Sequence, residues 1–432
     1  MSFIKSVDSE LYNIIQNEHR REHDTIELIA SENFASAAVL EAAGGVMTNK
    51  YAEGYPGKRY YGGCEHVDEV ENIARDRLSS LFNVEYTNVQ PHSGSQANMA
   101  TFMTFLNVGD TVMGLDLSHG GHLTHGSPVN FSGQLYNFIS YHIDKKSGRV
   151  DFDELWSLAK KHKPKMIICG GSAYPRFIEF EKFYEIANEI DAFLMADIAH
   201  PSGLIAAGVH PSPVEYCDVI TSTTHKTLRG PRGGIIMMGK DKENRWGKIA
   251  PKSGRVKMVS ELIDSSVMPG IQGGPLMHII SAKAIAFAEA MTNDFKEYAQ
   301  RIVVNSKVMA QSFLDLGYEL VSGGTDTHVV LIDLTNKNIS GKLAEKVLEK
   351  AGITVNKNMV PFDQKSPFIT SGIRIGTPAI TTRNMGVDEM SKIVKMIDTV
   401  IMDPENNENI NQVKAEVINL CESYPIYKEL SS

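Results

Sequence analysis

The sequence predicts an α/β fold in which a mostly parallel sheet with crossover helices is followed by a smaller α/β domain. Three strand-like segments each follow helical sequence, an alternation that is typical of a parallel sheet. These segments are residues 165–169, 192–196 and 218–220. Polar residues follow their ends: Ser172, Asp197, His200 and Lys226. Because such residues gather at one edge of a parallel sheet, we expect a binding site there.

The composition is that of an ordinary globular protein, with 42% hydrophobic and 22% charged residues. The length of 432 residues favours two domains. A net charge of −9 argues against nucleic acid as the main partner. Four scattered cysteines without C-x-x-C spacing indicate a reducing compartment and neither a disulfide framework nor a zinc site. No stretch is apolar enough for a signal peptide or a membrane helix, so we expect a cytoplasmic protein without a membrane partner.

The N-terminal part predicts a helix and then a binding loop. Residues 6–24 carry apolar side chains at helical spacing and predict an amphipathic helix. The pattern leaves open whether this helix packs on its own domain or on a partner subunit. Residues 50–63, KYAEGYPGKRYYGG, are too rich in glycine and charge for a core element. Three tyrosines beside a glutamate and an arginine favour a binding loop over a structural turn.

Two loops that follow predicted strands carry further candidates. SGSQAN, residues 93–98, opens a helix and suits an anion, although serine and asparagine also cap helices for stability alone. A predicted strand at 111–115 leads into a loop with His119, His122 and His125. We expect no metal there, because glycines interrupt the loop and no carboxylate or cysteine lies nearby in the sequence. A histidine that stacks on a ligand is the better hypothesis.

The stretch CDVITSTTHKTLRGPRGG, residues 217–234, places Lys226 just after a predicted strand. Near Arg229 and Arg232 a lysine loses proton affinity, and a neutral amine can attack a carbonyl. The alternative is a solvated loop lysine, which position alone favours. The next segment, GIIMMGKD, resembles a P-loop only in its glycines and lysine. We reject a nucleotide site, because Asp241 stands where a P-loop needs serine or threonine.

The C-terminal part predicts a second, smaller domain. We expect an N-terminal arm at 1–30, a large domain at 31–279 and a small domain at 280–432. A long helical region covers 281–316, and shorter strands and helices alternate after it. The predicted strands are 328–334, 353–356 and 372–376, and the predicted helices are 341–350, 387–401 and 412–422. Arg374 lies in the last of these strands and suits either a carboxylate ligand or an ion pair.

Together these features match the needs of pyridoxal 5′-phosphate. Its aldehyde needs a lysine, its ring nitrogen an acid and its phosphate an anion site, while an amino-acid substrate needs an arginine. The chain also resembles the serine hydroxymethyltransferase family over nearly its whole length. The motifs that carry the resemblance are ELIASENF, KYAEGYPGKRYYGG, SGSQAN, HGGHLTHGSPVNFSG, THKTLRGPRGG, QGGPLMH and TSGIRIGTPA.

The resemblance implies the aspartate-aminotransferase-like fold (fold type I), with a mostly parallel seven-stranded-type sheet in the large domain. It implies a pyridoxal-phosphate-dependent glycine hydroxymethyltransferase (EC 2.1.2.1). Such an enzyme converts L-serine and tetrahydrofolate reversibly into glycine and 5,10-methylenetetrahydrofolate, through an external aldimine and a quinonoid. It also implies a homodimer with shared active sites.

The resemblance assigns roles to individual residues. The implied catalytic residues are Lys226, Glu53, Asp197, His122, Tyr61 and His225. The implied cofactor-binding residues are Lys226, Ser93, Gly94, Ser95, His122, Ser172, Asp197, His200, Tyr51 and Gly273. Substrate binding is implied for Ser31, Tyr61, Glu53, His200 and Arg374, and folate binding for Leu117, Gly121, Leu123 and Asn358. Of these, Tyr51, Glu53, Tyr61 and Gly273 would act from the partner subunit.

Two departures from the family pattern and two rival functions stay open. Pro201-Ser202 and Phe362 replace residues that are more usual in the family, and Phe362 lies close to the folate residue Asn358. One rival is a folate-independent aldolase of the same fold that acts on β-hydroxy amino acids. The other is a non-catalytic dimer that binds folate or another partner, for which an imine-forming lysine has no use.

Overall fold

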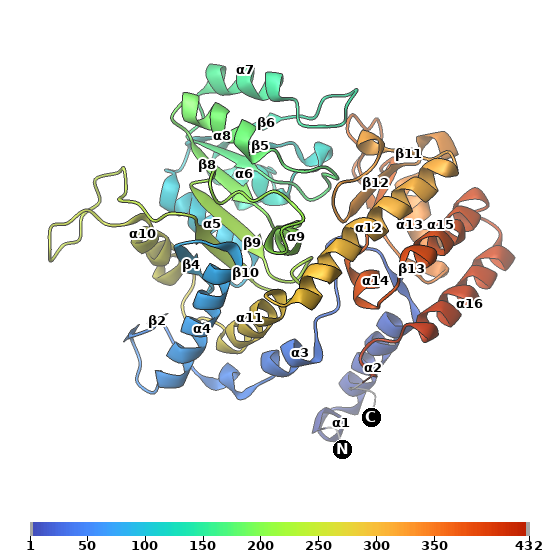
Figure 1. Ribbon diagram of the computed structural model, residues 1–432, viewed down its shortest axis with the longest axis horizontal. Coiled ribbons are helices and arrows are strands. Elements are labelled where there is room, and N and C mark those ends of the chain that lie inside the picture. Colours follow the sequence, from blue (N-terminus) through green and yellow to red (C-terminus); the bar gives the residue numbers. More distant parts are fainter. Residues whose placement is uncertain (1–2, 429–432) are drawn as a thin grey trace. The chain divides into compact units, whose positions relative to one another are not determined.

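The computed structural model describes residues 3–428, which form two compact units (Figure 1). The central unit is Asn33–Gln300, and the terminal unit joins the described residues up to Glu32 with those from Arg301 on. This division differs from the three predicted segments. Helix α11 (Met277–Ala290) packs on α4 (Glu65–Phe82) and α3 (Ala37–Ala43), so the boundary expected at residue 280 falls inside the central unit. The residues expected as an N-terminal arm group with the C-terminal part.

A seven-stranded sheet forms the centre of the central unit, in the order β4-β10-β9-β8-β7-β5-β6. Strands β9, β8, β7, β5 and β6 are parallel, and β10 runs antiparallel to both of its neighbours. The strands are β4 (Tyr86–Asn88), β5 (Thr111–Leu115), β6 (Asn137–Tyr141), β7 (Met166–Cys169), β8 (Phe193–Asp197), β9 (Val219–Thr223) and β10 (Gly234–Met238). The predicted mostly parallel sheet is confirmed.

Helices bury this sheet from both sides, which explains why its strands read as nearly continuous apolar runs. Strands β7, β9 and β10 are buried at every residue. One set of alternate strand residues, including Met166, Ile168 and Met195, packs with apolar side chains of α5 (Gly94–Phe105) and α10 (Val259–Ser265). Helices α7 (Phe152–His162) and α8 (Phe180–Glu189) contact β6, β7 and β8.

The remaining elements of the central unit are short. The helices are α6 (Phe131–Leu135) and α9 (Ser202–Ala206), the hairpin strands are β2 (Gly54–Tyr55) and β3 (Lys58–Arg59), and the 3₁₀ or π turns are η1 (Val46–Asn49), η2 (Leu117–His119), η3 (Leu123–His125) and η4 (Ser266–Ile271). The predicted strand at 111–115 is confirmed, and β7, β8 and β9 lie within a few residues of their predicted places. The predicted helical region at 281–316 is interrupted. It contains most of α11 and then α12 (Asn293–Asp315), which continues into the terminal unit.

The terminal unit has a four-stranded antiparallel sheet in the order β11-β12-β15-β14 and a separate parallel pair, β1 with β13. Its strands are β1 (Ile26–Glu27), β11 (Glu319–Leu320), β12 (Val329–Asp333), β13 (Ile353–Thr354), β14 (Asn356–Asn358) and β15 (Gly372–Gly376). Its helices are α1 (Phe3–Val7), α2 (Ser9–Asp24), α13 (Gly341–Lys350), α14 (Pro378–Thr382), α15 (Val387–Met402) and α16 (Asn407–Ser423), with 3₁₀ turns η5 (Val321–Gly323) and η6 (Thr335–Lys337).

Both ends of the chain contribute to the core of the terminal unit. Ile26 and Leu28 share a buried apolar cluster with Val417 and Cys421. The guanidinium of Arg383 donates to five backbone carbonyls, three from the N-terminal segment and two from the C-terminal one. These acceptors are Glu22, His23, Thr25, Cys421 and Tyr424, at 2.8–3.2 Å. The predicted N-terminal helix corresponds to α2 and contacts α16 of its own unit. No described helix is long and apolar enough to cross a membrane.

Candidate cofactor site

Asp197, the last residue of β8, is a buried carboxylate that accepts three hydrogen bonds. Its Oδ2 accepts from Asn98 Nδ2 at 2.9 Å and from His125 Nε2 at 3.1 Å. Its Oδ1 accepts from the backbone N–H of Ala199 at 3.1 Å. Burial opposes ionisation, but the hydrogen bonds from His125 and Asn98 outweigh it and hold the pKa of Asp197 well below its usual range. This residue is therefore a fixed negative charge at a strand end.

The same hydrogen bonds fix the tautomer of His125. Its Nδ1 accepts from the backbone N–H of His122 at 3.3 Å, so its proton lies on Nε2 and points at Asp197. Asn98 is also fully engaged. Its Oδ1 accepts from Thr221 Oγ1 at 2.6 Å, and its Nδ2 donates to Thr124 Oγ1 at 2.8 Å as well as to Asp197. The carboxylate is held by side chains that are themselves held in place.

The histidine loop divides into two parts. His119 lies apart from the carboxylate, where it accepts from the backbone N–H of Ile143 and its ring contacts that of His142. His122, His125 and Asp197 place their possible ligand atoms within 4.8 Å of one another. No carboxylate was expected near these histidines in the sequence, but the fold brings Asp197 to His122 and His125. The absence of a metal stays a prediction, and His125 Nε2 already bonds to the carboxylate.

Lys226 follows β9, the strand next to β8, and is buried. Its loop is tied down by backbone contacts, since its own carbonyl accepts from Asn33 Nδ2 at 2.9 Å and from the backbone N–H of Arg229 at 3.0 Å. The hydroxyl of Thr227 donates to the carbonyl of His200 at 2.6 Å and accepts from the backbone N–H of Gly203 at 2.9 Å. The alternative of a solvated loop lysine is thus excluded, because this side chain is 8% exposed.

The start of α5 packs closely against the end of β9. Ser93 caps the helix by accepting from the backbone N–H of Gln96 at 3.2 Å. A Cβ added at Gly94 would lie 2.7 Å from Thr223 Cγ2, so only glycine fits there without a shift. The first N–H groups of a helix have no acceptor within the helix, and its dipole favours an anion near them. Ser93, Gly94 and Ser95 therefore form a compact helix start of the kind that suits an anion.

These residues fit a phosphorylated pyridine aldehyde. They offer a buried amine on one strand end, an ionised acid on the next and a helix start for a phosphate. A buried polar atom also has no hydrogen-bond partner among the described residues, namely Nδ1 of His225. Burial, helped by the charges of Arg232 and Lys226, lowers the pKa of His225 to about 3. A neutral imidazole with an unused nitrogen suits a bound polar group.

Four predicted residues form a separate and more exposed cluster in the central unit. Tyr51 Oη donates to Glu53 Oε1 at 3.1 Å, and the rings of Tyr51 and Tyr61 meet edge to face at 5.2 Å. A Cβ added at Gly273 would lie 2.8 Å from Glu53 Oε1, which places this glycine beside the carboxylate. Tyr51 and Tyr61 are 54% and 48% exposed. The cluster is open to solvent in the single chain.

The predicted folate residues of the central unit lie on two turns after β5. Leu117 and Leu123 are 50% and 48% exposed, whereas Gly121 is buried. A Cβ added at Gly121 would lie 2.0 Å from the carbonyl oxygen of Leu115, so this turn requires glycine. The backbone N–H of Ser172 donates to the carbonyl of Gly120 at 2.6 Å. The structure thus brings the turn and Ser172 together.

Two of the three predicted residues of the terminal unit, Ser31 and Arg374 in β15, lie together. The Nε of Arg374 donates to Asn356 Oδ1 at 3.1 Å, and one terminal nitrogen donates to Ser31 Oγ at 3.4 Å. Burial lowers the pKa of Arg374 to about 10, with the charge of Glu32 opposing that effect. Asn358 lies in β14, and its side chain donates to the carbonyl of Met359 at 2.7 Å. Ser31 and Arg374 are therefore neighbours, as one substrate-binding group requires.

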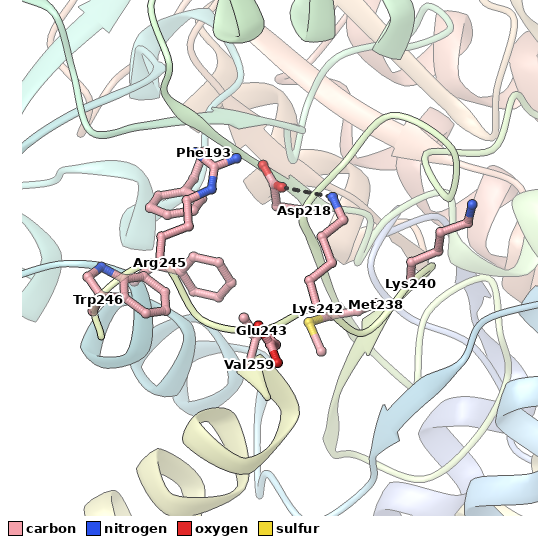
Figure 2. Close-up of a pocket in the computed structure, with 10 residues that line it drawn as sticks. Phe193, Asp218, Met238, Lys240, Lys242, Glu243, Arg245, Trp246 and Val259 are labelled. Atoms are coloured by element: carbon pink, nitrogen blue, oxygen red, sulfur yellow. Dashed lines mark ion pairs between the residues drawn. The ribbon is translucent and has the colours of Figure 1, made fainter. Parts of the chain in front are cut away.

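A surface pocket near Trp246 is a different feature (Figure 2). It lies where Phe105, Phe193 and Trp246 pack together, and none of the predicted site residues lines it. Two of its three cationic side chains have acidic partners. Lys242 pairs with Asp218 at 3.8 Å, as the dashed line marks, and Arg245 pairs with Asp191 at 2.9 Å. We assign this pocket to the packing of the segment after β10 against the sheet.

Sequence reasoning missed two residues of the carboxylate cluster. Asn98 lies in SGSQAN, but only its capping ability was considered. His125 was weighed as a metal ligand and not as a partner of Asp197. The signal for Asn98 is its place one helical turn after Ser95, on the side of α5 that faces β9. No local pattern pairs His125 with a carboxylate 72 residues away.

Comparison with protein families gives one match. The family model described as serine hydroxymethyltransferase matches residues 4–397 of the 432. The match includes the whole central unit, the terminal unit up to residue 397 and every predicted site residue. The seven-stranded, mostly parallel sheet agrees with the aspartate-aminotransferase-like fold that this family implies. We conclude that the chain belongs to the serine hydroxymethyltransferase family.

Proposed function

We propose that the strand-end cluster of Asp197 and Lys226 carries out the reaction of this family. That reaction is the reversible conversion of L-serine and tetrahydrofolate into glycine and 5,10-methylenetetrahydrofolate, with pyridoxal 5′-phosphate as cofactor (EC 2.1.2.1). The observation that carries the proposal is the pair of neighbouring strands, one ending in a buried ionised acid and the other leading to a buried amine. A non-catalytic binding protein has no need of either.

The cofactor, when bound, supplies an electron-withdrawing ring for bond breaking at the α-carbon of the substrate. Asp197 would hold a proton at the ring nitrogen, because His125 and Asn98 keep its carboxylate ionised. Lys226 would supply the amine for the aldehyde carbon. Ser93, Gly94 and Ser95 at the start of α5 would bind the phosphate, and Ser172 and His200 at the neighbouring strand ends would contact the cofactor. His122 would stack on the ring, and the neutral His225 would line the site.

Glu53 acts on the substrate hydroxyl. Its carboxylate accepts from Tyr51 and stands beside Gly273, where it can hold a proton at that oxygen. Arg374, next to Ser31, binds the carboxylate of the amino acid as a planar fork. Leu117, Gly121, Leu123 and Asn358 line the folate site.

The active form is a cytoplasmic homodimer in which Tyr51, Glu53, Tyr61 and Gly273 serve the active site of the partner subunit. The exposure of these tyrosines in one chain supports this arrangement, since aromatic side chains with polar tips are frequent at interfaces. The expected absence of nucleic-acid and membrane partners stays part of this proposal.

The first experiment measures serine cleavage by the purified protein with and without tetrahydrofolate, beside Lys226→Ala. We expect strong folate dependence and loss of both the yellow colour and the activity in the variant. The matched control is Lys252→Ala, an exposed lysine of the same unit. Equal rates with and without folate would favour the aldolase. A colourless and inactive wild type would exclude both enzyme functions.

A mixing experiment tests the shared sites. Lys226→Ala and Glu53→Gln each inactivate a homodimer. If the two residues act on the same site from different subunits, each mixed dimer keeps one intact site. Refolded equal mixtures then recover about a quarter of the wild-type activity, since about half of the dimers are mixed. Recovery at the background level would contradict the assignment of Glu53 to the partner's site.

A further inference from the structure

Lys283, in the middle of α11, is a fully buried lysine that lies outside the cofactor cluster. Its ammonium donates to three backbone carbonyls, those of Val89 at 2.6 Å, Gly234 at 2.9 Å and Pro91 at 3.1 Å. Three acceptors match the three N–H donors of an ammonium group. Burial lowers the pKa of Lys283 to about 7, with the carboxylate of Glu71 opposing that effect. Burying a charged amine costs free energy, so we expect this lysine to have a specific role in the structure.

Two of the three carbonyls belong to the segment that leads into the start of α5, and the third belongs to the start of β10. Val89 and Pro91 lie between β4 and Ser93, the cap of α5. Gly234 begins β10, and its own N–H donates to the carbonyl of Pro91 at 3.0 Å. A Cβ added at Gly234 would lie 2.2 Å from the carbonyl oxygen of Ser93. The ammonium therefore joins the segment before α5 to the start of β10.

The loop that carries Lys226 passes the same point. A Cβ added at Gly233 would lie 2.4 Å from Lys283 Cε and 3.0 Å from Nζ. The carbonyl of Gly233 accepts from the backbone N–H of Thr224, two residues before Lys226. One buried amine thus lies against both segments that would hold the cofactor, the helix start and the lysine loop.

We propose that Lys283 is a positioning residue for the cofactor phosphate, because its ammonium sets the place of the Ser93–Ser95 helix start against β10. The inference rests on the proposed phosphate-binding role of that helix start. Without the ammonium, three buried carbonyls lose a charged donor, and the segment between β4 and α5 is free to shift. The first N–H groups of α5 are then no longer held in position to bind the phosphate.

The test compares pyridoxal 5′-phosphate with pyridoxal, which lacks the phosphate. Both are titrated by absorbance into the full-length chain after its cofactor has been removed. In Lys283→Met the dissociation constant for pyridoxal 5′-phosphate should rise about ten- to hundredfold. This is the change expected when the segment between β4 and α5 loses its charged hydrogen bonds. The constant for pyridoxal should change less than about threefold, since it does not use the helix start. The preference for the phosphate form, which is the dissociation constant for pyridoxal divided by that for pyridoxal 5′-phosphate, therefore falls.

Two further variants separate positioning from general loss of stability. Phe287→Leu alters a fully buried residue of the same helix and should leave the preference unchanged. Lys283→Gln keeps two N–H donors and should restore part of the preference. An unchanged preference in Lys283→Met would overturn the inference, as would failure of both Lys283 variants to fold. A wild type without preference for the phosphate form would instead remove the proposed phosphate site itself, and the inference with it.

Discussion

Replacing Asp197 with asparagine tests the carboxylate cluster most directly. The wild-type side chain faces only donors, since Oδ2 accepts from Asn98 and His125 and Oδ1 accepts from the N–H of Ala199. An asparagine can keep its oxygen toward Asn98 and His125, but its NH₂ group then faces the N–H of Ala199. The opposite orientation is worse, because the NH₂ group would face two donors. His125 cannot adapt by changing tautomer without losing the bond from the N–H of His122.

These contacts set the size of the effect. Each of the two retained hydrogen bonds loses its charge, which costs about 1 kcal/mol. The backbone N–H of Ala199, which then faces another donor and has lost its acceptor, adds about 1–3 kcal/mol. The easier burial of a neutral amide offsets part of this sum. We expect the free energy of unfolding of the cofactor-free chain to fall by about 2–4 kcal/mol at pH 7.

Urea denaturation followed by circular dichroism measures this change. The control is Asp191→Asn, whose carboxylate is 90% exposed and pairs with Arg245 on the surface; it should change stability by less than about 0.5 kcal/mol. Because the pKa of Asp197 is lowered on folding, its stabilisation is complete above its ordinary pKa near 4 and is lost only as the pH falls below that value. A variant as stable as the wild type, or a difference that already shrinks between pH 7 and pH 5, would refute the reasoning.

Three other predictions use the same structure. Gly94→Ala pushes a methyl group into Thr223 and should weaken binding of pyridoxal 5′-phosphate about tenfold or more, measured by absorbance titration. Gly44→Ala is the control and should have no such effect, because its methyl group would lie 3.6 Å from the nearest atom, the carbonyl oxygen of Leu40. Because the pKa of His225 is lowered to about 3, folding excludes a proton that the unfolded chain takes up below pH 6.5. Stability should therefore fall from pH 6.5 to pH 5 in urea titrations, and less so in His225→Gln. Arg374→Lys should raise KM for serine about tenfold, because an ammonium cannot reproduce the bidentate fork; an unchanged KM in steady-state kinetics would exclude this role.

The parts of the fold that were predicted are those with a local signal. Strand β5 and helix α13 match their predicted ranges because a short apolar run and a 3.6-residue period mark them. Strand β4, with only three residues, has no such signal, and no strand was predicted at β6. The antiparallel direction of β10 depends on its pairing with β9, which no local pattern contains. The domain division also escaped prediction, because β1 joins β13 from the other end of the chain.

The site shows the same division between local and distant information. Asp197 and Lys226 were predicted because each follows a recognisable strand. The hydrogen bond between His125 and Asp197 was not, since it joins residues from separate loops. Lys283 lies on an apolar helix face, where the sequence gives no sign that its amine meets three carbonyls. Pairings of this kind depend on the packing of the unit and not on the residue types alone.

The joining of both chain ends in the terminal unit has a consequence for biosynthesis. Ile26 and Leu28 leave the ribosome early, but the apolar side chains that cover them, such as Val417, are made much later. The same holds for the carbonyls of Glu22, His23 and Thr25, whose donor is Arg383. The central unit is contiguous and can therefore fold during translation. The N-terminal segment must wait, with its apolar residues uncovered, until the C-terminal part of the terminal unit has been made. During that interval its exposed apolar side chains favour aggregation of nascent chains.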